Sequence, residues 1–265
     1  MIRILFSGCS FVYGTGLLNE KDDPDHFANV LSTELFENKF LKNIGVSGNT
    51  NLRIFLDSCQ EISLNNYDYA FVCWTSYPRH IFWLGLEEYE TKRTFIPSSI
   101  IKSPLIEHRG NDIGFSSSTL INFNNTLSLI NHPHYDILDI VIYVNILKSL
   151  ANSKNTKIYF INNICHWDLD FFKRIDNPLP SNLTQYTNKI LNSDNRDDDQ
   201  IKNLYNKIHD DYESRGSIHE DLWLNLYESF YSQQTDLAID NRHPGPVSHK
   251  NFGSFLAKKF KQLNG

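Results

Sequence analysis

The sequence is short of glycine and lacks any long apolar run. Only 12 of its 265 residues are glycine, about 4.5% against a usual share of roughly 7%. Several of these glycines gather in two short stretches before residue 49, as expected of loops whose backbone needs unusual freedom. No run of about 18 apolar residues occurs, so the sequence predicts no transmembrane helix and no membrane partner.

Positive charge is not in excess either. The chain carries 25 Lys and Arg against 31 Asp and Glu, a formal net charge of −6. A nucleic-acid-binding protein needs surplus basic side chains that displace counterions, so nucleic acid is not an expected partner. Hydrophobic residues make up 40% of the chain and aromatic residues 13%, which is typical of a folded globular protein rather than a disordered one.

Cysteine is scarce and shows no pairing pattern. Cys9, Cys59, Cys73 and Cys165 form no CxxC pair and no metal-ligand spacing, so we expect reduced thiols and no metal. The first eight residues contain too short an apolar stretch for a signal peptide, and they lack a cleavage site. Both observations favour a soluble, cytoplasmic protein.

Apolar runs that are followed by turn residues and then by helical periodicity predict an α/β fold. The predicted strands cover residues 2–6, 42–44, 69–74 and 157–162. The predicted helices begin at Asp23-Pro24, run along 52–62 and 140–150, and follow Ser248 near the C-terminal end, with His249 in the first turn. Residues 69–74 are apolar throughout, as expected of a strand buried on both faces.

Two long stretches do not fit a simple α/β repeat. They cover residues 77–138 and 165–235, and the second has predicted helices near 198–213 and 220–231. Because structureless loops of this length are rare in compact domains, we interpret both as insertions that decorate one edge of the sheet and shape a pocket. No internal repeat or linker divides the sequence, so we expect a single domain over residues 1–265.

Three short segments carry the residue types that acyl transfer requires. They are residues 8–14 (GCSFVYG) after the first strand, 43–50 (NIGVSGNT) between a strand and a helix, and 240–244 (DNRHP) before the last helix. In doubly wound sheets, ligands bind beyond the carboxyl ends of the strands, and the first two segments would lie there. The third segment could reach the same edge from the last connection.

Ser10, Asp240 and His243 form a candidate catalytic triad. A serine hydroxyl is a weak nucleophile until an adjacent base takes its proton. His243 can be that base, and Asp240 can orient its imidazole across a tight turn. The backbone N–H groups of Ser10 and Gly48 are candidate oxyanion-hole donors. No GxSxG elbow occurs, which argues against an ordinary α/β-hydrolase.

The three segments resemble motifs of the SGNH hydrolases, also called the GDSL-like esterase/lipase superfamily. Residues 8–14 resemble its first block, with Gly-Cys-Ser in place of Gly-Asp-Ser, and residues 43–50 and 240–244 resemble the second and the last block. The resemblance implies a flavodoxin-like three-layer α/β/α fold with about five parallel strands. It also implies cofactor-free acyl hydrolysis or transfer, with Gly48 donating to the oxyanion and Asp240 and His243 completing the triad.

The third block departs from this resemblance. The family normally has Gly-x-Asn-Asp after the third strand, where the asparagine is an oxyanion donor, whereas here Trp74 replaces the glycine and Ser76 the asparagine. Three possibilities stay open: Ser76 or Thr75 is the third donor, the oxyanion hole has only two donors, or the site is impaired. The first is favoured, with Ser76 as the donor. Trp74, Thr75 and Arg79 are candidate substrate-binding residues, since the arginine fork suits a carboxylate, a phosphate or a sugar hydroxyl.

The sequence therefore predicts a serine esterase that removes an acyl group, with acetyl favoured, from a carbohydrate or another small polar ester. Tyr77, Trp83, Tyr135 and Trp167 in the insertions could stack on a sugar. Two alternatives stay open: an O-acyltransferase with the same triad, and a binding module of the same fold with little catalysis. Nothing in the sequence indicates the oligomeric state.

Overall fold

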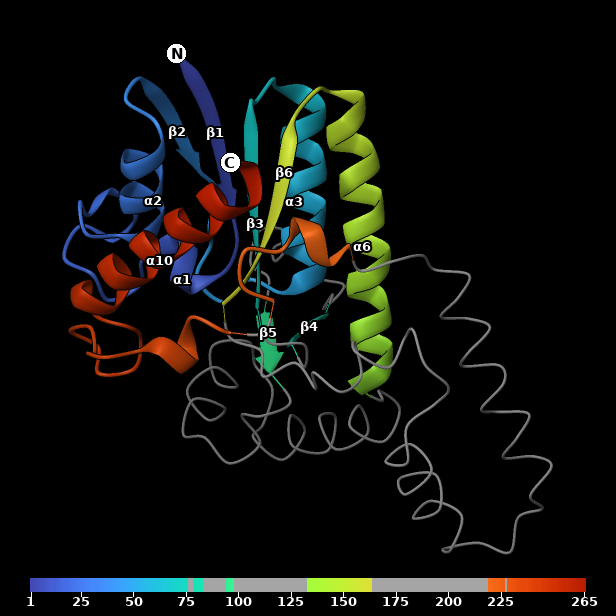
Figure 1. The fold of residues 1–265 in the computed structure, drawn as a ribbon. Coiled ribbons are helices and arrows are strands. Elements are labelled where there is room, and N and C mark those ends of the chain that lie inside the picture. The colour runs from blue at the N-terminus through green and yellow to red at the C-terminus, as the bar shows by residue number, and fades with distance from the viewer. Residues whose placement is uncertain (76–78, 83–93, 98–132, 164–218, 227) are drawn as a thin grey trace, which may run out of the picture.

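Four parallel strands form the central sheet of the protein (Figure 1). The computed structural model describes residues 1–75, 79–82, 94–97, 133–163, 219–226 and 228–265. Strand order across the sheet is β2 (Lys39–Asn43), β1 (Ile2–Ser7), β3 (Tyr69–Trp74) and β6 (Lys157–Asn162). All three neighbouring pairs are parallel. The predicted α/β class with a parallel sheet is confirmed.

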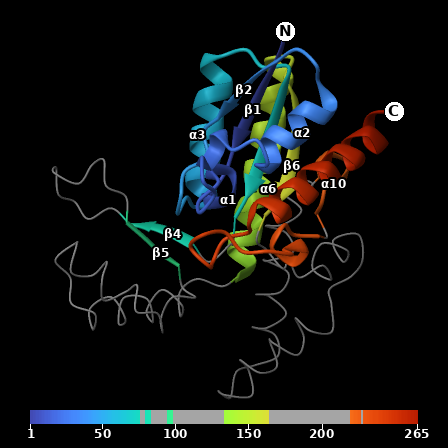
Figure 2. The same ribbon diagram turned by 90° about the vertical axis from the view of Figure 1, so that its left-hand side faces the viewer.

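Helices cover both faces of this sheet (Figures 1 and 2). Helices α3 (Asn51–Leu64) and α6 (Pro133–Ser153) pack together on one face. Helices α2 (Phe27–Leu35) and α10 (Pro246–Asn264) pack together on the other. The result is the three-layer α/β/α arrangement that the motifs implied.

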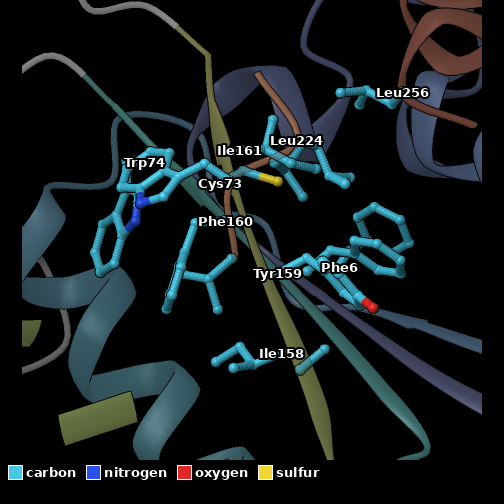
Figure 3. Packing of buried hydrophobic residues seen from close by; sticks show 14 of the residues in the cluster. Phe6, Cys73, Trp74, Ile158, Tyr159, Phe160, Ile161, Leu224 and Leu256 are labelled. Atoms are coloured by element: carbon cyan, nitrogen blue, oxygen red, sulfur yellow. The ribbon is translucent and has the colours of Figure 1, made fainter. Parts of the chain in front are cut away.

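Aromatic rings fill the core on both sides of the sheet (Figure 3). On the side of α6, Trp74 stacks on Phe160 with ring centroids 6.0 Å apart. On the side of α2 and α10, Phe6 stacks on Phe71 at 4.8 Å. Each of these four side chains is fully buried. Because successive strand residues point to opposite faces, the uninterrupted apolar run of β3 supplies both layers at once.

Most of the element predictions are confirmed, with shifts at the boundaries. The strands at 2–6, 69–74 and 157–162 are present, and the strand expected at 42–44 runs over Lys39–Asn43. The helices predicted along 52–62 and 140–150 are α3 and α6, and the last helix begins at Pro246 rather than after Ser248. As predicted, His249 lies in its first turn.

The start of α2 was wrongly predicted. Asp23 follows a short 3-10 helix, η1 (Glu20–Asp22), and α2 begins at Phe27. The N-cap is His26, whose Nδ1 accepts the backbone N–H of Ala28 at 3.2 Å. A histidine is not among the favoured capping residues, so the sequence offers no local signal for this start.

The segment that lies beside β6 at the edge of the sheet differs from the predicted helix near 220–231. About five strands were implied, and the described residues form four, with a single parallel bridge between Phe160 and Trp223 in the next position. The described residues of 220–231 form no α-helix: the structure shows the short 3-10 helices η4 (Glu220–Leu222) and η5 (Tyr231–Gln233) there. The reason is that Asn225 holds this segment to the backbone of Asn162. Part of the second insertion therefore lies in the core, where Trp223 and Phe230 are buried.

The first insertion contributes a two-stranded antiparallel sheet of β4 (Arg79–Phe82) and β5 (Thr94–Pro97). The helix expected near 198–213 lies outside the described residues. In the described part of the chain, every helix is too short or too polar to cross a lipid bilayer.

Candidate active site

Ser10 lies where the chain turns sharply after β1. It is the first residue of the four-residue helix α1 (Ser10–Tyr13), and it is 4% exposed. Gly14 ends this helix with a left-handed φ of 79° and donates its N–H to the carbonyl of Ser10 at 2.9 Å. Gly8 precedes the turn, and a Cβ there would come within 2.3 Å of Val12 Cγ2. These two glycines allow the tight turn that presents Ser10 at the carboxyl end of the strand.

The loop after β2 is fastened to the Ser10 turn. Asn43 donates its Nδ2–H to the carbonyl of Val12 at 2.6 Å and accepts the N–H of Gly45 at 2.9 Å. The N–H of Val46 donates to the carbonyl of Gly8 at 3.1 Å. Because β1 and β2 are parallel neighbours, both loops leave the same edge of the sheet and pack directly on each other.

Gly48, the second candidate oxyanion donor, lies in this loop with a φ of 78°. This left-handed backbone favours glycine over any residue with a Cβ. Neither the N–H of Gly48 nor that of Ser10 meets a hydrogen-bond acceptor among the residues that the structure describes. Two backbone donors on adjacent loops are therefore available to a ligand.

Asp240 and His243 form a compact hydrogen-bonded pair. Their side chains are 2.5 Å apart, from Asp240 Oδ2 to His243 Nδ1. The other carboxylate oxygen accepts the N–H groups of Arg242 and His243, each at 3.0 Å. Asn241, at the tip of the turn, has a left-handed φ of 54°. Since Nδ1 is engaged by the carboxylate, Nε2 is the imidazole nitrogen left for proton transfer.

The electrostatics of the turn favour an ionised Asp240. Partial burial by itself would raise the pKa of this carboxyl. The backbone N–H and the ring of His243, and then the N–H of Arg242, outweigh that effect and hold the pKa below its usual value. The carboxylate is therefore charged near neutral pH and can stabilise an imidazolium.

Contacts of Phe11 and Gly16, which follow Ser10, place the Asp240–His243 turn against the Ser10 turn. The ring of Phe11 meets that of His243 edge to face, with centroids 5.7 Å apart. The carbonyl of Gly16 accepts the N–H of Ile239 at 3.2 Å, and a Cβ at Gly16 would lie 3.0 Å from Asp240 Oδ1. The Ser10 hydroxyl and His243 are not hydrogen-bonded to each other in the structure. Such bonds are often long before substrate binds.

Asp236 anchors the turn to α10, and it was missed in the sequence. Its carboxylate accepts the N–H groups of Val247 at 3.1 Å and Ser248 at 2.7 Å, and also the Ser248 hydroxyl. Burial would raise the pKa of Asp236, but the Ser248 hydroxyl and the backbone N–H groups lower it. Its own carbonyl accepts the N–H of Gly245 at 3.0 Å, which closes the turn at its base. Asp236 lies nine residues before Gly245, the N-cap of α10, so no local capping pattern marks it in the sequence.

Trp74, a candidate substrate-binding residue, is the last residue of β3. This side chain is fully buried and stacks on Tyr143 and Phe160, so the structure gives it a core role rather than a contact with substrate. Thr75 is also fully buried, and Asn51 holds its backbone. Ser76 and the side chain of Arg79 lie outside the described residues, as do the side chains of Tyr77, Trp83, Tyr135 and Trp167.

Cys9, beside Ser10, is fully buried with a free thiol, as is Cys73. Burial raises the pKa of the Cys73 thiol well above its usual value, so it is a core residue and no nucleophile. Within the described ranges, no group of three or more His, Cys, Asp or Glu side chains is placed to hold a metal ion.

Two more histidines lie beneath the site. His26 and His249 are fully buried, with ring centroids 4.9 Å apart. The Nε2–H of His26 donates to the carbonyl of Phe11 at 3.0 Å, because its Nδ1 already accepts the N–H of Ala28. Burial lowers the pKa of His26 to about 4, although its hydrogen bond to Phe11 acts in the opposite direction. Burial likewise lowers the pKa of His249 well below its usual value. Both rings are therefore neutral at neutral pH.

No family model and no curated protein matches this sequence. Among solved structures, the chain is similar to a carbohydrate acetylesterase family member from Sinorhizobium meliloti, with 11% identity, a TM-score of 0.45 and 99% of each chain covered. It is also similar to the inhibitor-bound aryl esterase of M. smegmatis, with 12% identity, a TM-score of 0.44, and 99% of this chain and 100% of that chain covered. A lipase/acylhydrolase from Enterococcus faecalis has 12% identity and a TM-score of 0.41, with 99% of this chain and 96% of that chain covered. At such low identities and TM-scores, we infer the chemistry from this chain's own residues.

Proposed function

We propose that the protein is a serine esterase of the SGNH type. The observation that carries the proposal is the hydrogen-bonded pair of Asp240 and His243, which packs on the residues that directly follow Ser10. The two parts come from opposite ends of the chain. A partly exposed Asp–His pair packed against the turn that carries a serine supports nucleophilic acyl transfer, which uses these three residue types.

In the proposed reaction, the Ser10 hydroxyl attacks the ester carbonyl carbon and His243 Nε2 takes its proton. Asp240 holds the ring and stabilises its positive charge. The N–H groups of Ser10 and Gly48 donate to the oxyanion of the tetrahedral intermediate, with Ser76 or Thr75 as the proposed third donor. His243 then protonates the leaving alcohol. Water, deprotonated by the same histidine, attacks the acyl-enzyme. As the second intermediate collapses, His243 gives this proton to Ser10 Oγ, and the acid and the free serine hydroxyl are released.

The proposed substrate is an ester, with acetyl favoured, of a carbohydrate or another small polar alcohol. Two features of the sequence support it: the aromatic residues of the insertions and the absence of a long apolar lid. Arg79 and Thr75 stay candidate substrate-binding residues. The single domain over residues 1–265 and the cytoplasmic location stay predictions.

The first test compares p-nitrophenyl acetate hydrolysis by the wild-type protein and a Ser10→Ala variant. We expect kcat to fall by about 10³-fold or more, because loss of the nucleophile removes the acyl-enzyme route. Ser7→Ala is a matched control, since this buried hydroxyl on β1 has no hydrogen-bond partner among the described residues and its loss should leave the rate near wild type. Equal rates for Ser10→Ala and wild type would refute the assignment.

A binding module is the alternative that the altered third block favours, together with the absence of a Ser10–His243 hydrogen bond. A fluorophosphonate probe separates the two, because it labels an activated serine and leaves an inert one unmodified. Product analysis with and without sugar acceptors distinguishes the esterase from an O-acyltransferase with the same triad.

A further inference from the structure

Asn51 grips the backbone of Thr75 at both of its polar groups. Its Oδ1 accepts the Thr75 N–H at 2.8 Å, and its Nδ2–H donates to the Thr75 carbonyl at 3.1 Å. Both residues are buried, Thr75 completely. Asn51 is the first residue of α3, and Thr75 directly follows β3. Since a planar amide bound at both ends allows little rotation, this clamp fixes the direction in which the chain leaves β3.

The clamp joins two parts of the proposed oxyanion hole. Asn51 lies three residues after Gly48, and Thr50 between them caps α3 by accepting the N–H of Arg53 at 3.2 Å. On the other side of the same loop, Asn49 donates to the carbonyl of Gly8 at 3.4 Å. Asparagine side chains thus fasten the Gly48 loop to the Ser10 turn on one side and to the end of β3 on the other.

We propose that Asn51 is a positioning residue for the oxyanion hole: it fixes the chain at the end of β3 against the Gly48 loop. This inference rests on the proposed esterase function. Asn51 touches no reacting atom in this role. Oxyanion donors must be aimed to within about 0.5 Å, and displacement of a site by about 1 Å can lower the rate about 100-fold. A loosened clamp should therefore slow the chemical step more than it weakens substrate binding.

Asn225 provides a matched control for the loss of such a clamp. It holds the backbone of Asn162 in the same way, accepting the N–H at 2.9 Å and donating to the carbonyl at 2.8 Å. It is 5% exposed, against 7% for Asn51. Its partner ends β6, which is separated from β1 by β3. Replacement of Asn225 removes a buried clamp of the same kind away from the Ser10 and Gly48 loops, together with the bond that Asn225 Nδ2 donates to the Glu228 carbonyl at 2.6 Å.

The experiment measures kcat and KM on p-nitrophenyl acetate, the urea midpoint and the fluorophosphonate labelling rate for Asn51→Ala and Asn225→Ala. We expect comparable decreases in the urea midpoint. For Asn51→Ala, kcat should fall about 10- to 100-fold with KM changed by less than about twofold, and labelling should slow in parallel. For Asn225→Ala, kcat should stay within about threefold of wild type.

Equal kcat values for the two variants, corrected for folded fraction, would overturn the inference and make Asn51 a general structural clamp. If Asn51→Ala does not fold, Asn51→Asp serves instead, since it keeps an acceptor for the Thr75 N–H and loses the donor. A wild-type kcat in Asn51→Asp would also overturn the inference.

An inactive wild type, or a Ser10→Ala variant as active as wild type, would overturn both proposals together. The Asn51 proposal alone would be overturned if the wild type is active, Ser10→Ala is inactive and Asn51→Ala keeps the wild-type kcat.

Discussion

The protein places histidines in two opposite environments on either side of Phe11. On one side, His243 lies in a turn with its side chain 23% exposed and bonded to Asp240. On the other side, His26 and His249 are buried side by side. Phe11 contacts both regions, because its ring packs on His243 and its carbonyl accepts the His26 Nε2–H. The environment alone makes one imidazole a candidate base and keeps the other two neutral.

The largest effect in this comparison is expected at His243. A His243→Gln variant keeps a polar side chain but cannot carry a proton from Ser10 to the leaving group. We expect kcat on p-nitrophenyl acetate to fall about 10³- to 10⁴-fold, with the free energy of unfolding changed by less than about 1 kcal/mol because the side chain is partly exposed. Retained activity in this variant, measured beside Ser10→Ala, would exclude His243 as the base.

An effect on stability is expected from the buried pair, through pH. The pKa of His26 is lowered to about 4 by burial, and that of His249 is lowered well below its usual value by burial and by the nearby His26 and His243. Between pH 6.5 and 4 the unfolded chain therefore binds more protons than the folded one. Stability should be fully present above about pH 6.5 and decline as pH falls toward 4, with roughly 3 kcal/mol attributable to His26.

Urea unfolding at pH 7.5 and pH 4.5 measures this effect, with His26→Asn as the comparison. Asparagine can still cap α2 and does not titrate in this range. The variant should lose less stability on acidification than the wild-type protein does. An identical loss in both proteins would show that His26 does not contribute to the pH dependence.

The smallest effect is expected at His249. Its Nε2 meets no hydrogen-bond partner among the described residues, and its ring packs on Phe27 and Phe230. His249→Phe should change the free energy of unfolding by about 1 kcal/mol or less, because the gained apolar contact offsets the lost bond from the Phe27 N–H. Its kcat should stay within about twofold of wild type. A large loss of kcat would place His249 among the groups that act on substrate. It would contradict the distinction between a catalytic His243 and a purely structural His249.

Much of the fold was predictable because its signals are local. The apolar runs of β3 and β6 are long enough to identify buried parallel strands, and the glycines at 8, 14 and 48 mark turns that any other residue would strain. The Asp240–His243 pair was predictable for the same reason, since a separation of three residues suffices for its hydrogen bonds.

The parts that were not predicted depend on contacts between distant segments. Trp74 was a candidate substrate-binding residue, but its ring packs on Tyr143 of α6 and Phe160 of β6. Residues 220–231 have apolar spacing like that of a helix, yet Asn225 binds the end of β6 instead. The expectation of α2 starting after Asp23 failed because His26 caps the helix and bonds to Phe11.

By itself the sequence determined which chemical groups are present, their order, and the tight turns that hold them. It could not determine that these turns meet. Their meeting depends on four parallel strands that end at one edge of the sheet, and on side-chain bonds such as that between Asn51 and Thr75, 24 residues apart. Such bonds leave no periodic pattern in the chain, because an asparagine in a turn looks the same whether its amide faces water or another segment's backbone.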